Sequence, residues 1–337
     1  MGSLARPVAR ATIDAVRAIR FHRPGGPEVL SLDEIPLPRP GPGEALVRLA
    51  LAGVNFVDIY HRSGLYAAGP LPARLGKEGT GQVVAVGPGV DRVTPGERVA
   101  FAEATGSYAD SVVLPADRLL PVPEGMSDQL AAALPLQGMT ADYLVRTIGR
   151  VAPGDRVLVH AAAGGVGRLA VQLAKHAGAT VIGTCSTPGK ALAASAAGCD
   201  HTILYGEVDF AAEVLRLTGG RGCDLVLDSV GQATFLGSVR ATRLRGILVV
   251  FGQSSGMIDP FSPRPVLGSR TLVSATLFDY VRDRAELVER WRRICGEHAS
   301  GRLEVAIDRV LPLAQAAEAH RLLASRATTG KLLLQVA

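Results

Sequence analysis

A glycine-rich stretch between residues 156 and 167 holds the residues with the clearest chemistry. It reads Arg156-Val-Leu-Val-His-Ala-Ala-Ala-Gly-Gly-Val-Gly167, which indicates an apolar strand, a tight turn and the first turn of a helix. The free N–H groups and positive dipole end of a helix N-terminus attract phosphate. The stretch is a variant of the dinucleotide fingerprint G-x-G-x-x-G, with Ala162 in the first glycine position. We therefore expect a pyrophosphate site at Gly164, Gly165, Val166 and Gly167.

The end of the next expected strand, residues 179–184, indicates which dinucleotide binds. NAD sites usually have an Asp or Glu there, which binds the ribose 2′-OH. This chain has Ser186, Thr187 and Lys190 instead, and the next acid is Asp200. A lysine among hydroxyl groups favours a 2′-phosphate, to which it can donate a charge-assisted hydrogen bond. We interpret the cofactor as NADPH; the alternative is that Lys190 is a solvated lysine at the start of the next helix.

Composition sets the protein class. The chain has 337 residues, 47% of them hydrophobic, and 39 glycines, which is typical of a two-domain α/β protein. The net charge of +5 is spread along the chain, which favours steering of an anionic cofactor over a nucleic-acid-binding arm. The four cysteines lack C-x-x-C spacing, which favours free thiols in the cytoplasm. No uncharged apolar stretch is long enough for a membrane span.

The hydrophobic pattern predicts two domains. From Val16 the chain is rich in short strands, such as 44–51 and 81–87, between Gly- and Pro-rich turns. From Gln137 strands and helices alternate, which indicates a doubly wound parallel sheet. The expected strands of that sheet are 156–160, 179–184, 202–205, 224–228 and 246–251. Near the C-terminus we expect strands at 302–308 and 331–336 and helices at 280–299 and 314–325.

The expected domain organisation follows from this change of pattern. A β-rich catalytic domain comprises residues 17–136 and 269–337, and a nucleotide-binding domain, 137–268, is inserted into it. Residues 1–16 are expected to be a disordered extension.

Six segments of the chain match one enzyme family. They are Phe21-His-Arg-Pro-Gly-Gly-Pro-Glu-Val-Leu30, Gly53-Val-Asn-Phe-Val-Asp-Ile-Tyr-His-Arg-Ser-Gly-Leu-Tyr66, His160-Ala-Ala-Ala-Gly-Gly-Val-Gly167, Asp228-Ser-Val-Gly231, Phe251-Gly-Gln-Ser-Ser-Gly256 and Ser325-Arg-Ala-Thr-Thr-Gly330. Through them the chain resembles the NADPH:quinone oxidoreductase branch, which includes zeta-crystallin, of the medium-chain dehydrogenase/reductase superfamily. The resemblance extends from Val16 to Val336. It implies a GroES-like catalytic domain, a Rossmann domain inserted in it, a cleft between the two, and a homodimer.

The resemblance also bears on metal binding. Zinc-dependent relatives have a cysteine ligand just before the position of Val54 and a histidine in a Gly-His-Glu motif. This chain has Gly76-Lys77-Glu78 at the second position and no cysteine before Cys185. A catalytic zinc needs about three protein ligands. We therefore expect no metal, and we expect Glu78 to pair with a basic neighbour in the cleft wall.

Without a metal, side chains must polarise the substrate, and three match the family's catalytic cleft. Asn55 would donate a hydrogen bond to the ribose, the nicotinamide or the carbonyl oxygen. Tyr60 would donate its phenol proton to developing negative charge; its alternative role is to hold the cofactor. Tyr66 would be catalytic or a wall of the cleft. Further cofactor contacts implied by the resemblance are Thr140, Tyr205, Phe251, Gly252, Gln253 and Arg326.

The substrate prediction follows from the family and from one departure. Family members often carry Thr-Arg-Pro before a Leu-x-x-Tyr segment, whereas this chain has Val273-Ser274-Ala275. The missing cation favours a less anionic, or larger and apolar, acceptor. We expect an NADPH-dependent quinone reductase; the alternative is an enoyl or enone reductase. A third function, the RNA binding of zeta-crystallin-like proteins, has little support from 4% aromatic residues and dispersed charge.

Overall fold

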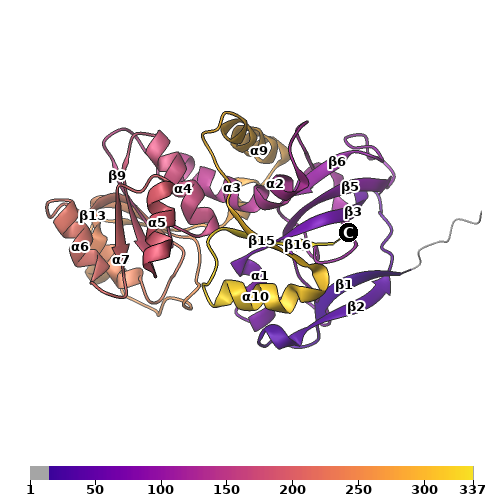
Figure 1. The fold of residues 1–337 in the computed structure, drawn as a ribbon, viewed down its shortest axis with the longest axis horizontal. Coiled ribbons are helices and arrows are strands. Elements are labelled where there is room, and N and C mark those ends of the chain that lie inside the picture. The colour runs from indigo at the N-terminus through magenta and orange to yellow at the C-terminus, as the bar shows by residue number, and fades with distance from the viewer. Residues whose placement is uncertain (1–14, 337) are drawn as a thin grey trace, which may run out of the picture.

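Two large β-sheets organise the chain, one in each half of the molecule (Figure 1). The computed structural model describes residues 15–336. The first and last parts of the chain build the half on the right of Figure 1, and the middle part builds the half on the left. The middle part is therefore inserted into a fold that the two ends complete together.

The half formed by the chain ends contains a seven-stranded sheet with the order β15-β16-β3-β5-β6-β8, in which β7 also pairs with β3, and a three-stranded sheet with the order β2-β1-β4. Its strands are β1 (Ala15–Phe21), β2 (Leu30–Pro36), β3 (Glu44–Val54), β4 (Ala73–Arg74), β5 (Glu78–Val86), β6 (Arg98–Phe101), β7 (Ser111–Pro115), β8 (Leu120–Pro121), β15 (Ile307–Pro312) and β16 (Lys331–Gln335). Its helices are α1 (Phe56–Ser63), α2 (Asp128–Ala133) and α10 (Ala316–Ala324). Val47 and Leu334 share one core, so this half needs both ends of the chain.

The other half is a parallel six-stranded sheet with the order β11-β10-β9-β12-β13-β14. Its strands are β9 (Arg156–Val159), β10 (Thr180–Cys185), β11 (His201–Leu204), β12 (Cys223–Asp228), β13 (Thr242–Val250) and β14 (Thr271–Ser274). Its helices are α4 (Gly165–His176), α5 (Pro188–Ala196), α6 (Phe210–Leu217), α7 (Phe235–Ala241) and α8 (Pro263–Leu267). Apolar cores cover both faces, so β12 is buried along its whole length. If β9 is numbered as the first strand, the order is 3-2-1-4-5-6, which is the strand order of dinucleotide-binding sheets.

Two boundaries differ from those expected. Residues 1–14 of the expected extension lie outside the described residues, and its last residues, Ala15 and Val16, belong to β1, where they pair with β2. The expected domain boundary at residue 268 falls before β14, which pairs with β13 as the edge strand of the parallel sheet. We propose that the nucleotide-binding half extends at least to Ser274.

The strand expected at 302–308 begins only at Ile307. The preceding helix, α9 (Arg284–Ala299), explains the shift. The amides of Arg302 and Leu303 donate hydrogen bonds back to the carbonyl of Glu297, so these residues close the end of the helix instead of entering the sheet.

None of the helices in the described part of the chain has the length and apolar character needed to cross a membrane.

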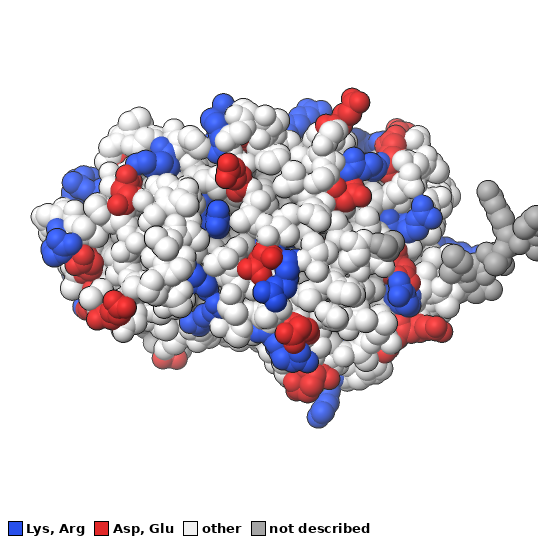
Figure 2. All heavy atoms as spheres, viewed as in Figure 1, with Lys and Arg blue, Asp and Glu red and all other residues white. Residues whose placement is uncertain are grey.

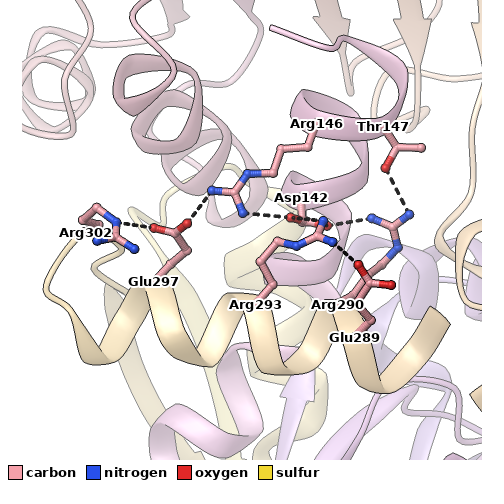
Figure 3. Close-up of polar contacts among 8 residues, drawn as sticks. All are labelled: Asp142, Arg146, Thr147, Glu289, Arg290, Arg293, Glu297 and Arg302. Atoms are coloured by element: carbon pink, nitrogen blue, oxygen red, sulfur yellow. Dashed lines mark hydrogen bonds and ion pairs between the residues drawn. The ribbon is translucent and has the colours of Figure 1, made fainter. Parts of the chain in front are cut away.

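A buried ion cluster fixes α9 to the segment that joins the two halves, helix α3 (Pro135–Asp142) and the π-helical turn η3 (Tyr143–Ile148). Figure 3 shows Asp142 among three arginines, Arg146 from η3 and Arg290 and Arg293 from α9. The carboxylate of Asp142 is fully buried and lies 2.6 Å from Arg290, 3.2 Å from Arg293 and 3.3 Å from Arg146. A buried carboxylate needs such compensation, so these contacts set where α9 packs.

A second buried polar chain links α1 to α10. Asp58 accepts hydrogen bonds from the main-chain N–H of Asn55 at 3.0 Å and from the Tyr108 hydroxyl at 2.9 Å. The Tyr108 hydroxyl lies 3.4 Å from Nε2 of His320, and Nδ1 of His320 lies 3.2 Å from Nη1 of Arg62. Burial raises the pKa of Asp58 to about 6. Burial, and secondarily the charge of Arg62, lowers the pKa of His320 to about 3.

These two pKa shifts act on stability in opposite directions. The unfolded state protonates His320 near its ordinary pKa of 6.5, so acid favours unfolding as pH falls from that value. Asp58 has the opposite effect, so that through this group acid favours folding. Its carboxyl has a pKa near 3.8 in the unfolded chain and about 6 in the folded protein, which therefore binds the proton more tightly.

Substituting His320→Asn isolates the histidine contribution. The folded parent should lose about 2 kcal/mol of unfolding free energy between pH 7 and pH 5 through His320 alone, and the variant should not. Urea unfolding of both proteins at the two pH values measures this. The difference in unfolding free energy between the two proteins should be smaller at pH 5 than at pH 7. A difference that does not change with pH would contradict the assignment.

Candidate active site

A cavity of about 460 Å³ lies between the two halves and takes its walls from both. Residues 54–66 and the C-terminal segment 323–330 contribute from one half, and the loops that follow β9, β10, β12 and β13 contribute from the other. The loops lie at the carboxyl ends of parallel strands, and the strand order of the sheet reverses between β9 and β12. This is the position at which doubly wound sheets bind ligands.

One wall is the turn from β9 to α4, where Gly164, Gly165, Val166 and Gly167 all face the cavity. The turn depends on small residues: a Cβ on Gly167 would lie 2.3 Å from the carbonyl oxygen of Ala161, and one on Gly165 would lie 2.2 Å from the side chain of Gln137. Gly164 is the N-cap of α4, whose first turn has no acid. This helix start therefore fits the pyrophosphate of a dinucleotide.

Two cations meet at another part of the wall. Ser186, Lys190, Tyr205 and Arg326 line the cavity there. The ammonium of Lys190 donates a hydrogen bond to the main-chain carbonyl of Arg326. Burial lowers the pKa of Lys190, and the neighbouring charge of Arg326 lowers it further. These groups fit a 2′-phosphate, because a dianion would compensate both cations.

Thr187 is the one predicted site residue that does not line the cavity. Its hydroxyl accepts a hydrogen bond from the amide of Lys190 at 3.3 Å and caps α5. A threonine hydroxyl at a helix start can bind either a ligand or the helix itself, and here it binds the helix. Thr187 therefore positions Lys190.

Tyr60 joins the two halves at the cavity. Its hydroxyl accepts a hydrogen bond from the main-chain amide of Gln253, at 2.9 Å, and its ring meets that of Tyr66 edge-on, with the centroids 5.1 Å apart. Burial raises the pKa of Tyr60 to about 12. The phenol therefore keeps its proton, which remains available for donation into the cavity. Both tyrosines line the cavity, as do Phe251 and Gly252.

Asn55 lines the cavity, but its amide is held from behind by a buried ion pair. Nδ2 donates to Oε1 of Glu78 at 2.8 Å, and Oδ1 accepts from the ammonium of Lys331 at 2.8 Å. Lys331 and Glu78 are also ion-paired with each other, and Oε2 of Glu78 accepts from the amide of Leu136 at 2.8 Å. The expected pairing of Glu78 with a basic neighbour is confirmed. Asn55 thus has only limited capacity to bind a ligand.

Sequence reasoning did not find Lys331, which is 1% exposed. The chain has four lysines, and this one starts the apolar strand Lys331-Leu-Leu-Leu-Gln335. A lysine in a buried strand requires a partner, and that was the available signal. The sequence analysis also missed several residues of the cavity wall that no motif indicates, which include Leu136, Tyr143, Leu277, Phe278 and Asp279. Thr140 was expected and lies in the wall. Within residues 15–336 no three His, Cys, Asp or Glu side chains converge as a metal site.

Comparison with known proteins identifies the relatives of this arrangement. Residues 41–124 match the alcohol dehydrogenase GroES-like domain, and residues 165–298 match the zinc-binding dehydrogenase family. A 2-haloacrylate reductase of Burkholderia sp. is 40% identical over 95% of this chain and 98% of its own length. A quinone oxidoreductase of Pseudomonas aeruginosa is 40% identical over 94% of this chain and 99% of its own.

The structural relatives agree. The crystal structure of Escherichia coli quinone oxidoreductase complexed with NADPH has a TM-score of 0.93 and 39% identity, covering 95% of this chain and all of that one. The matches confirm the expected pairing of a GroES-like domain with a parallel nucleotide-binding sheet. The chain belongs to the quinone oxidoreductase family of the medium-chain dehydrogenase/reductase superfamily.

Proposed function

We propose that the protein is an NADPH-dependent oxidoreductase that reduces a quinone or a similar conjugated carbonyl without a metal. The observation that carries the proposal is the single cavity that brings together a helix start for the pyrophosphate, two cations for a 2′-phosphate and the Tyr60 phenol. Bound NADPH supplies the hydride. The NADPH complex of the Escherichia coli relative supports the choice of cofactor.

The chain's own groups bind, orient and donate. The amides at the start of α4 and the cations Lys190 and Arg326 would bind the phosphates of the cofactor. The side-chain Oε1 of Gln253 is buried without a partner in the described structure and lies in the same wall, so it is free to accept from the cofactor. Tyr60 donates its proton to the acceptor oxygen as negative charge develops there.

The alternative activity is reduction of an enone or enoyl compound. The name of the Burkholderia relative, 2-haloacrylate reductase, favours it, because a 2-haloacrylate is a conjugated alkene. RNA binding has less support. On the face drawn in Figure 2, basic and acidic side chains are interspersed and form no continuous basic area.

The proposal includes a homodimer in the cytoplasm. Strand β14 forms one edge of the parallel sheet in the described structure, and an exposed edge strand can pair with its copy in a second subunit. The four cysteines are all free and buried, which supports a reducing compartment.

An acceptor panel tests the proposed activity. The purified protein should oxidise NADPH in the presence of naphthoquinone or phenanthrenequinone, followed by the loss of NADPH absorbance, and a chelator should not lower the rate. An enone and an enoyl thioester measure the alternative. A protein that turns over none of these acceptors, or that stops when zinc is removed, would overturn the proposal.

The cofactor assignment is tested at Lys190. Loss of a hydrogen bond to a charged group costs roughly 1.5–3 kcal/mol, so Lys190→Ala should weaken NADPH binding about ten- to a hundredfold. NADH, which has no 2′-phosphate, should be affected little. Lys175→Ala is the matched control, because that lysine pairs with Asp200 on the surface. Equal losses for NADPH and NADH would show that Lys190 only supports the helix.

The role of Tyr60 is tested by Tyr60→Phe. Removing the proton donor should lower kcat by up to roughly 10²-fold, the lower end for general acid catalysis, because water protonates a reduced quinone easily. The affinity for NADPH, measured by fluorescence titration, should change little. Because the pKa of Tyr60 is raised to about 12, kcat of the parent should show no phenol ionisation up to pH 10. An unchanged kcat on every acceptor would make Tyr60 a wall residue only.

A further inference from the structure

An open hollow of about 740 Å³ lies in the nucleotide-binding half, at the amino ends of strands β12, β13 and β14. This is the end of the parallel sheet opposite to the cofactor cavity, and no residue lines both. In the described part of the chain, the hollow is lined by no acidic side chain and by five basic ones, which are Arg221, Arg240, Arg243, Arg245 and Arg270. Guanidinium groups that converge in this way create a positive potential, which attracts anions.

Two acids that do not line the hollow neutralise part of this charge. Asp224, which is 8% exposed, accepts hydrogen bonds from Arg221 at 2.7 Å and from Arg243 at 2.5 Å. Asp209 accepts from Arg240 at 2.9 and 3.0 Å. Five guanidinium charges are thus balanced by two carboxylates, which leaves an excess of three positive charges at the hollow.

Arg245 and Arg270 are the two arginines of the hollow that have no acidic partner. Arg270 donates hydrogen bonds to the main-chain carbonyls of Thr242 at 2.6 Å and Leu267 at 3.1 Å, so neutral acceptors hold its guanidinium in place. The guanidinium of Arg245 makes no hydrogen bond or ion pair with any residue in the range 15–336. Both groups therefore keep N–H donors available for an anion.

The backbone of β13 is bent where it carries these arginines. Residues 243–246 lie opposite the single residue Asp224 of β12, so they bulge out of the sheet. Arg245 has a φ of 61°, a left-handed conformation that is unfavourable for a residue with a Cβ. Bulges redirect side chains, and backbone strain of this kind occurs at binding sites. A position with this φ and no binding role would be better filled by glycine.

We propose that the hollow is a second anion site, which binds a ligand with several adjacent phosphates, either an inorganic oligophosphate or the triphosphate of a nucleotide. A guanidinium binds phosphate oxygens through two parallel hydrogen bonds, and a chain of phosphates can reach several arginines at once. The excess of three positive charges favours such a ligand over a single carboxylate. The site acts independently of the reduction, because none of its residues lines the cofactor cavity.

Inorganic tripolyphosphate is the probe, titrated calorimetrically into the full chain with and without NADPH. The parent should bind one tripolyphosphate per chain at the hollow with the same Kd in both conditions, and its Tm should rise with the ligand. A parent that does not bind, or a Kd that rises with NADPH because the probe occupies the cofactor cavity, would overturn the proposal.

Variants locate the bound anion. Arg245→Gln and Arg270→Gln should each raise the tripolyphosphate Kd about tenfold, because each removes a charge-assisted hydrogen bond. Arg48→Gln is the charge-matched control, because that arginine lies in the other half and bonds Gln82 at 3.1 Å on the surface; it should leave the Kd unchanged. Equal losses in all three variants would show only a response to net charge and would contradict the site.

Arg245→Gly separates loss of binding from loss of the fold. Glycine adopts the left-handed conformation freely, so the unliganded variant should have a Tm at or above that of the parent, whereas its tripolyphosphate Kd should rise as in Arg245→Gln. A parent-like Kd for this variant would remove Arg245 from the site. If the double variant Arg245→Gln/Arg270→Gln instead changes the oligomeric state, the arginines serve a contact between subunits and the proposal is wrong.

Two further ligands distinguish the source of the phosphates. ATP that binds more tightly than tripolyphosphate would identify a nucleotide as the ligand, and an equal Kd would identify the phosphate chain alone. A single-stranded RNA that binds these arginines more tightly than either would overturn the assignment, because the phosphates of RNA are separated by riboses.

Discussion

The arrangement of the active site depends on one buried carboxylate. Glu78 begins β5 in the middle of the larger catalytic sheet and is fully buried. Its two oxygens accept from Asn55 and Lys331 on one side and from the amide of Leu136, at the start of α3, on the other. The positive end of the helix dipole favours a carboxylate there. Glu78 therefore fixes three parts of the structure relative to one another: Asn55 in the cavity wall, strand β16, and helix α3, which leads into the nucleotide-binding half.

The energetics explain why this arrangement must be complete. Leaving one partner of a buried ion pair unpaired typically costs about 3–5 kcal/mol, whereas a fully bonded pair contributes little net stability. The pair therefore contributes specificity of arrangement. Glu78 occupies the position where zinc-dependent relatives of this fold are expected to have a Gly-His-Glu motif, and here its charge is balanced by an ammonium from a strand 253 residues further along the chain.

Features that depend on a few neighbouring residues could be predicted from the sequence. Features that depend on contacts between distant segments could not. The β9–α4 turn could be predicted because glycine, alanine and the helix start specify backbone geometry within a few residues. The parallel sheet could be predicted from its alternation with helices. Lys331 could not, because only the tertiary fold shows that this lysine pairs with Glu78. Thr187 shows a third case: the same hydroxyl could serve a ligand or a cap, and the local sequence does not distinguish them.

The central placement of the last strand has a consequence for synthesis. Strand β16 lies between β15 and β3, so the catalytic sheet remains divided until residues 331–335 have left the ribosome. Until then Glu78 lacks its ammonium partner, and the apolar core shared by both chain ends is open. The strands of the parallel sheet, in contrast, all come from residues 156–274. Vectorial folding therefore favours completion of the inserted half first, and the catalytic half completes its sheet only after β16 has emerged.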